Sequence, residues 1–222
     1  AVAVVDGPSP DLAGYVSEAG VTNGGYSITY RTGIFGLAAA LLLFAVALPA
    51  PSRIVTALLV VAAANTVVSG AVSCTDRCPL PPFEVVTAAD LVHGAASVLA
   101  VACCVFAMLA LTCSPTVDAA VRRLAVTGAA GALPLSGAVG LGMLTLGRGM
   151  VVGVLERLLL ALIVLWVAAT AVRVGVAGLR GNERDGEQGD RPGGDGSGRS
   201  AYGQAQNRTV ANVPTGRKPH RR

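Results

Sequence analysis

Charged side chains are what this sequence has least of. They make up 14% of its 222 residues, and several long stretches contain no Lys, Arg, Asp or Glu at all. A soluble helical bundle needs a polar face on each helix, so charge-free stretches of this length argue against that class. Short strands of alternating polarity are also missing, which argues against a membrane β-barrel.

Recognisable catalytic and metal-binding motifs are also absent from the sequence. It has no phosphate-binding loop, no HExxH or GxSxG motif and no multi-cysteine metal spacing. A metal site at Cys74 and Cys78 would need two further ligands nearby, and only His93 is available. We therefore expect no metal, no cofactor and no nucleic-acid partner, and the biochemical function is weakly constrained.

What the sequence does contain is a series of apolar stretches long enough to cross a membrane. About 20 helical residues, each rising about 1.5 Å, span a hydrocarbon core of about 30 Å. We therefore predict an all-α, polytopic transmembrane helical bundle in residues 1–178, embedded in a lipid bilayer. Five complete spans are expected near residues 33–50, 54–73, 91–112, 124–146 and 152–174.

The first five residues, AVAVV, are apolar and allow two interpretations. They are either the end of a truncated first span or a mature N-terminus left after removal of a signal or Met. Five spans with a cytoplasmic C-terminus would leave the N-terminus outside, whereas a sixth, preceding span would put both termini inside. We favour the six-span arrangement.

The distribution of arginine predicts the orientation of the bundle. Alternate loops fall on opposite sides, and the side that receives the C-terminal tail carries more arginine. Up to residue 191 its arginines are Arg53, Arg122, Arg123, Arg173, Arg180, Arg184 and Arg191, against Arg31, Arg77, Arg148 and Arg157 on the other side. Since basic loops stay in the cytoplasm, we expect the C-terminus to be cytoplasmic.

The last part of the chain, residues 179–222, has a different composition. It is rich in Gly, Pro, Arg and Asp and nearly free of aliphatic residues, so we predict a disordered cytoplasmic tail. Its basic end, Arg217, Lys218, Arg221 and Arg222, could contact anionic lipid head groups. The alternative is a tail that is simply solvated.

Cys74 and Cys78 share a loop on the side predicted to be outside the cell. On an oxidising face, a pair with this spacing is expected to form a disulfide that closes a small loop, contributing about 2 kcal/mol. Free thiols are the alternative.

Polar side chains within the spans are expected to gather at one depth, near the outer surface. Spacings of three and four residues put the polar groups of each span on one helical face. The cluster comprises Asp90, His93 and Ser97 of the third span, Asn65 and Ser69 of the second, and Glu156 and Arg157 of the last. Because polar groups at membrane depth are costly, they usually face the bundle interior and find partners there.

This cluster has a functional and a structural interpretation. In the functional one, His93 is oriented by Asp90 and acts as a base or binds an ion, with Glu156 as a further catalytic candidate. In the structural one, Asp90 caps its helix, His93 donates to a neighbouring helix, and Glu156 pairs with Arg157 or Arg148. The spacing alone leaves both open.

The order of several short elements resembles a known family. The elements are YVSEAG at 15–20, YR at 30–31, a Pro-rich loop with cysteines that ends in DLVHG at 90–94, and ER at 156–157. This order resembles the domain of unknown function 998 family, multi-pass membrane proteins of high-GC bacteria. The resemblance implies six spans and a plasma-membrane location, but no activity. It puts a His-Gly element on His93 and Gly94 and an SEL-like element on Ser17-Glu18-Ala19, where Ala19 departs from a bulkier apolar residue.

Three functional hypotheses follow. The first is a non-catalytic multi-pass membrane protein that works as a scaffold, a sensor or an envelope-associated component. The second is a membrane-embedded enzyme that acts on lipid or envelope precursors through Asp90, His93 and Glu156. The third is a small transporter, which ranks last because the inner halves of the spans offer few polar side chains.

Overall fold

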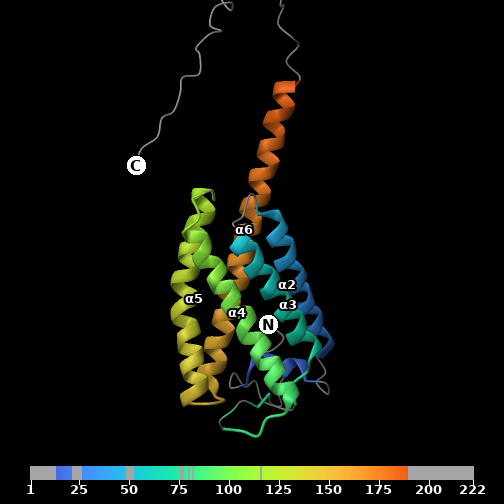
Figure 1. Ribbon diagram of the computed structural model, residues 1–222, viewed down its shortest axis with the longest axis vertical. Helices are drawn as coiled ribbons and strands as arrows, with labels where there is room; N and C mark the ends of the chain where they lie inside the picture. Colours follow the sequence, from blue (N-terminus) through green and yellow to red (C-terminus); the bar gives the residue numbers. More distant parts are fainter. Residues whose placement is uncertain are drawn as a thin grey trace, which may run out of the picture. The chain divides into compact units, whose positions relative to one another are not determined.

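The structure is a computed structural model that describes residues 14–21, 27–48, 53–75, 78–79, 81, 83–115 and 117–189, with side chains as far as residue 178. A short 3-10 helix, η1, precedes five α-helices (Figure 1). The elements are η1 (Val16–Gly20), α2 (Ser27–Ala47), α3 (Arg53–Ala71), α4 (Ala88–Thr112), α5 (Ala119–Thr145) and α6 (Met150–Gly189). The predicted all-α class is confirmed, and the described ranges contain no strand.

All five α-helices are long and apolar enough to cross a membrane, with α6 counted as far as Gly178. Consecutive helices run in opposite directions (Figure 1). Many large apolar side chains point outward, among them Val46, which is 85% exposed, and Leu43, which is 71% exposed. Water would penalise such a surface and lipid would not, so the chain is a polytopic membrane protein.

The centre of the bundle is filled by side chains of all five helices. Trp166 of α6 packs edge-on against Phe44 of α2, with 5.5 Å between the ring centroids. The same indole lies over Gly128 of α5, where an added Cβ would lie 2.8 Å from its Cδ1 atom. Trp166 is therefore a packing residue that joins α2, α5 and α6.

The helices extend beyond several of the predicted spans. Thus α2 begins at Ser27, ahead of the predicted start at residue 33, and takes Arg31 into its first turns. Likewise α5 begins at Ala119, where the Asp118 carboxylate accepts a hydrogen bond from the Ala120 amide. The predicted boundary of this span followed charge, whereas α5 begins where Asp118 caps it.

Two compact units divide the chain close to the predicted start of the tail. Residues 1–179 form one compact unit and residues 180–222 another, and α6 continues as a helix to Gly189. The described part of the predicted tail, as far as Gly189, continues the helix of α6. The rest of that tail, with its basic end, lies outside the described residues, as does the proposed span remnant at residues 1–5.

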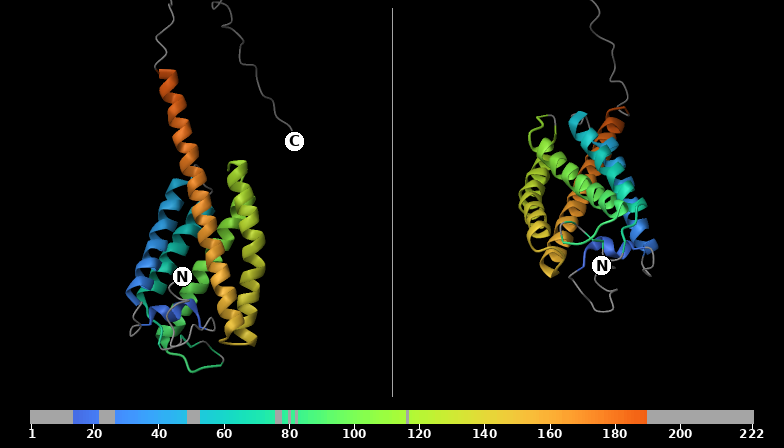
Figure 2. Two further views of the ribbon diagram at one scale, coloured as in Figure 1. Left: turned by 180° about the vertical axis from the view of Figure 1, so that it is seen from behind. Right: turned by 60° about the horizontal axis from the view of Figure 1, so that its bottom comes forward.

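One end of the bundle gathers most of the polar structure. Residues 14–21, 72–75, 83–87 and 146–149 meet there, and we call it the cap end (Figure 2). The opposite end carries the last residues of α2 and α4 and the first residues of α3 and α5. Every polar side chain of the predicted cluster comes from the half of its helix that is nearer the cap end.

Candidate functional site

Residues 14–21, which we call the cap segment, are fastened to the start of α6 through Glu18. The Glu18 carboxylate accepts two hydrogen bonds from Arg148, each 2.7 Å long, in a bidentate ion pair. It also accepts the Tyr15 amide at 3.0 Å, which closes the turn of η1. The hydrogen-bonded ion pair with Glu18 raises the pKa of Arg148 above its usual value.

Two residues of α6 complete this attachment. The Glu156 carboxylate accepts the Val16 amide at 3.1 Å, and the Arg157 guanidinium donates to the Gly14 carbonyl at 2.9 Å. We call Glu18, Arg148, Glu156 and Arg157 the clamp. Beside it, burial and the negative charge of Glu156 raise the pKa of the Tyr15 hydroxyl.

Asp90 is a structural carboxylate at the start of α4. Its oxygens accept hydrogen bonds from the amides and the hydroxyls of both Thr75 and Thr87, at 2.7 to 3.0 Å. The Thr87 contacts form a capping box, and the Thr75 contacts hold the loop that follows α3. In that loop, Cys74 and Cys78 form a disulfide, with 5.1 Å between their Cα atoms.

The expectation that Asp90 orients His93 is wrong. The Asp90 oxygens are occupied by the two threonines, and the His93 Nδ1 atom instead lies 2.9 Å from the Val72 carbonyl oxygen. A carbonyl can only accept, so Nδ1 carries a proton, and in the neutral ring Nε2 keeps a lone pair. The Nε2 atom is buried and has no hydrogen-bond partner among the described residues.

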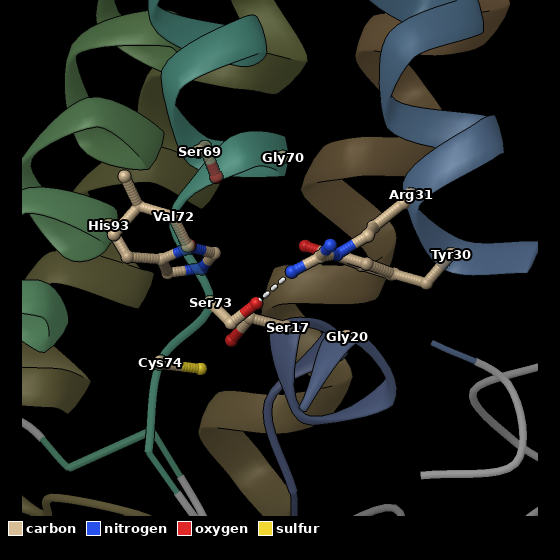
Figure 3. Close-up of a pocket in the computed structure, with 10 residues that line it drawn as sticks. All are labelled: Ser17, Gly20, Tyr30, Arg31, Ser69, Gly70, Val72, Ser73, Cys74 and His93. Atoms are coloured by element: carbon tan, nitrogen blue, oxygen red, sulfur yellow. Dashed lines mark hydrogen bonds between the residues drawn. The ribbon is translucent and has the colours of Figure 1, made fainter. Parts of the chain in front are cut away.

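His93 lies in the wall of a narrow pocket between α2, α3, α4 and the cap segment, which we call the His93 pocket (Figure 3). Its imidazole and the Arg31 guanidinium enter from opposite sides, and Arg31 donates to the Ser73 hydroxyl between them (Figure 3). In this structure the pocket has no room for a water molecule. The lining residues are Ser17, Gly20, Tyr30, Arg31, Ser69, Gly70, Val72, Ser73, Cys74 and His93.

The predicted polar cluster thus divides into separate parts. Ser69 and Ser97 share a hydrogen bond of 2.8 Å, and the Ser97 hydroxyl donates to the His93 carbonyl, so these three residues meet. Asn65 instead donates to the Val61 carbonyl one turn back in its own helix. Asp90, Glu156 and Arg157 do not line the pocket.

Sequence reasoning missed Arg31 and Ser73 as site residues and missed the partner of Arg148. From the sequence, Arg31 was counted as a loop charge and as part of the YR element at 30–31, but not as a site residue. Its position near the start of a span was the signal that could have identified it. The Glu18–Arg148 pair joins residues 130 positions apart, and no local periodicity relates them.

Comparisons with known proteins give one match. A family model described as "Protein of unknown function (DUF998)" matches residues 1–173 and confirms the resemblance drawn from the sequence. No curated protein and no solved structure matches the chain.

Proposed function

The chain belongs to the DUF998 family of proteins of unknown function, and we propose that it is a non-catalytic plasma-membrane protein that works as a scaffold or sensor. The cap end faces out of the cell in this proposal, and the C-terminus is cytoplasmic. Family membership and the five apolar helices support the membrane location.

One observation carries the non-catalytic part of the proposal. The two carboxylates that sequence reasoning offered for catalysis are both engaged by protein donors. Asp90 accepts from Thr75 and Thr87, and Glu156 accepts from Val16. The bonds that these two carboxylates accept hold a loop, a helix start and the cap segment in place, which supports a structural role for both groups.

Two features support the orientation. The arginine bias favours a cytoplasmic tail, and the Cys74–Cys78 disulfide at the cap end suits an oxidising compartment. Cys113, an exposed free cysteine at the opposite end, would then lie on the cytoplasmic side.

Labelling of cysteine in intact cells tests this orientation. A membrane-impermeant maleimide should modify Cys113 only after the cells are permeabilised. The matched control is Val85→Cys combined with Cys113→Ser, since Val85 is 96% exposed in the cap-end loop and should label without permeabilisation. Labelling of Cys113 in intact cells would overturn the orientation.

A second candidate function is a membrane-embedded enzyme that acts on lipid or envelope precursors. It is favoured by the buried lone pair of His93, across the pocket from a cationic guanidinium. Mass spectrometry of lipids incubated with the purified protein distinguishes the two functions. Turnover that disappears in His93→Asn would establish the enzyme and exclude the non-catalytic proposal.

A further inference from the structure

We propose that the His93 pocket binds a ligand with a phosphate ester and a neighbouring hydroxyl group, an inference that rests on the proposed sensor function. Arg31 and His93 supply the two halves of this recognition from opposite walls of the pocket (Figure 3).

The charge of the pocket selects an anion. Arg31 is cationic, and the ten lining residues include three serines and one tyrosine but no carboxylate. Arg31 now donates to the neutral Ser73 hydroxyl. A phosphate oxygen is a stronger acceptor than a serine hydroxyl and matches the planar guanidinium fork, so it would displace Ser73 from Arg31.

The imidazole adds the requirement for a hydroxyl. The Val72 carbonyl fixes the proton on Nδ1, and the buried Nε2 atom has no partner within the described residues. A lone pair in that position is satisfied only by a donor, and a ligand hydroxyl supplies one. An ester that carries a hydroxyl beside its phosphate therefore satisfies His93 and Arg31 together.

The position of the pocket favours a lipid as the source of this group. Arg31 lies in the first turns of α2 and Ser73 just beyond α3, which is where two adjacent spans reach the head-group level at the cap end. The pocket is closed in this structure, and Ser17 and Gly20 of the cap segment form one wall. Binding must therefore move the cap segment, which the Glu18–Arg148 pair holds in place.

The test uses the full chain in phosphatidylcholine nanodiscs, with its thermal midpoint as readout. One arm adds phosphatidylglycerol to the discs, and the other adds soluble glycerol phosphate or inorganic phosphate to the buffer. A ligand at about 100 times its Kd should raise the midpoint by about 5 to 10 °C. A shift in the first arm alone identifies a lipid head group, and a shift with soluble glycerol phosphate identifies the free ester.

Variants show whether the shift comes from this pocket. His93→Asn and Arg31→Gln should weaken binding at least roughly tenfold, while Arg53→Gln, which removes an exposed cation at the start of α3, should leave it unchanged. If Arg31→Gln does not fold, Ser73→Ala provides the test instead. This variant frees the Arg31 guanidinium, so it should bind the ligand as tightly as the wild type or more tightly. Wild-type shifts in folded His93→Asn and Arg31→Gln, or a lost shift in folded Ser73→Ala, would overturn the inference.

The failure of this inference is distinguishable from the failure of the proposed function. If neither arm shifts the thermal midpoint and cysteine labelling follows the expected pattern, the ligand-binding inference is wrong and the membrane-scaffold proposal stands. If chemically altered lipid is recovered and the thermal midpoint also shifts, the non-catalytic proposal is wrong and the binding-site inference stands.

Discussion

The clamp and the His93 pocket lie at the same end of the bundle but differ in whether their polar groups are paired. In the clamp, Glu18 and Glu156 receive amide or guanidinium donors. In the pocket, His93 uses one ring nitrogen and leaves the other without a partner in the described part of the chain.

This difference in hydrogen bonding distinguishes residues with a structural role from a residue with a functional role. A satisfied buried carboxylate stabilises the fold through the bonds it accepts, and its removal leaves several donors exposed to an apolar interior. A buried nitrogen without a hydrogen-bond partner adds no such stabilisation, and burying it costs free energy of folding. The clamp and Asp90 are therefore expected to govern stability, whereas His93 is expected to govern ligand binding.

The largest effect is expected for Asp90→Asn. Loss of charge weakens every bond from Thr75 and Thr87, and the carboxamide cannot accept all of them, so the free energy of unfolding should fall by about 3 kcal/mol. The control is Asp118→Asn, which changes an exposed cap with a single bond to the Ala120 amide and should cost about 1 kcal/mol or less. Thermal midpoints and the yield of monodisperse protein check both, and equal losses would contradict the structural role of Asp90.

The next effect is expected for Gly20→Ala, which pushes the cap segment off the pocket. A Cβ on Gly20 would lie 2.5 Å from the Tyr30 ring, so either the ring or η1 must move, at a cost of about 1 to 3 kcal/mol. Gly33→Ala is the matched control, because apart from its chain neighbours and the backbone of its own helix no atom lies within 4 Å of its Cβ position. Hydrogen exchange of residues 14–21 should speed up in the first variant only. Unchanged exchange would mean that the cap segment is not seated on Tyr30.

The membrane architecture was predictable from sequence because hydrocarbon imposes a strict rule on the chain. Every span must be apolar and about 20 residues long, and this requirement is visible without tertiary information. The spacing of Asp90, His93 and Ser97 likewise gave a shared helical face. Their burial classes agree with that placement, since Asp90 and His93 are buried and Ser97 is half-buried.

The partners of these residues were not predictable in the same way. His93 and Asp90 lie on one face, but their partners, Val72 and Thr75, come from the end of α3 and the loop after it. The hydrogen-bond partners of these residues depend on the path of the loop from the end of α3 to the start of α4. No periodicity of the sequence specifies that path. The same reason hides the long-range pair of Glu18 and Arg148.

A smaller effect is expected when the Glu18–Arg148 pair is broken. Both side chains are partly exposed, so solvent screens the pair, and a double-mutant cycle with Glu18→Gln and Arg148→Gln should give a coupling of about 1 kcal/mol. The coupling should decrease at high salt. A coupling near zero would show that the cap segment is held by Glu156 and Arg157 alone.

The smallest effect on stability is expected at His93. In His93→Asn the amide nitrogen can take the place of Nδ1 and still donate to the Val72 carbonyl, so only the unpartnered Nε2 is lost. The free energy of unfolding should then change by less than about 1 kcal/mol, the small remaining cost coming from lost volume. His93→Leu keeps more volume but removes the donor, so it should cost about 1 kcal/mol more than His93→Asn. Chemical or thermal unfolding in one detergent compares the two variants directly. A loss in His93→Asn as large as that in Asp90→Asn would mean that Nε2 has a structural partner, and the contrast between clamp and pocket would then disappear.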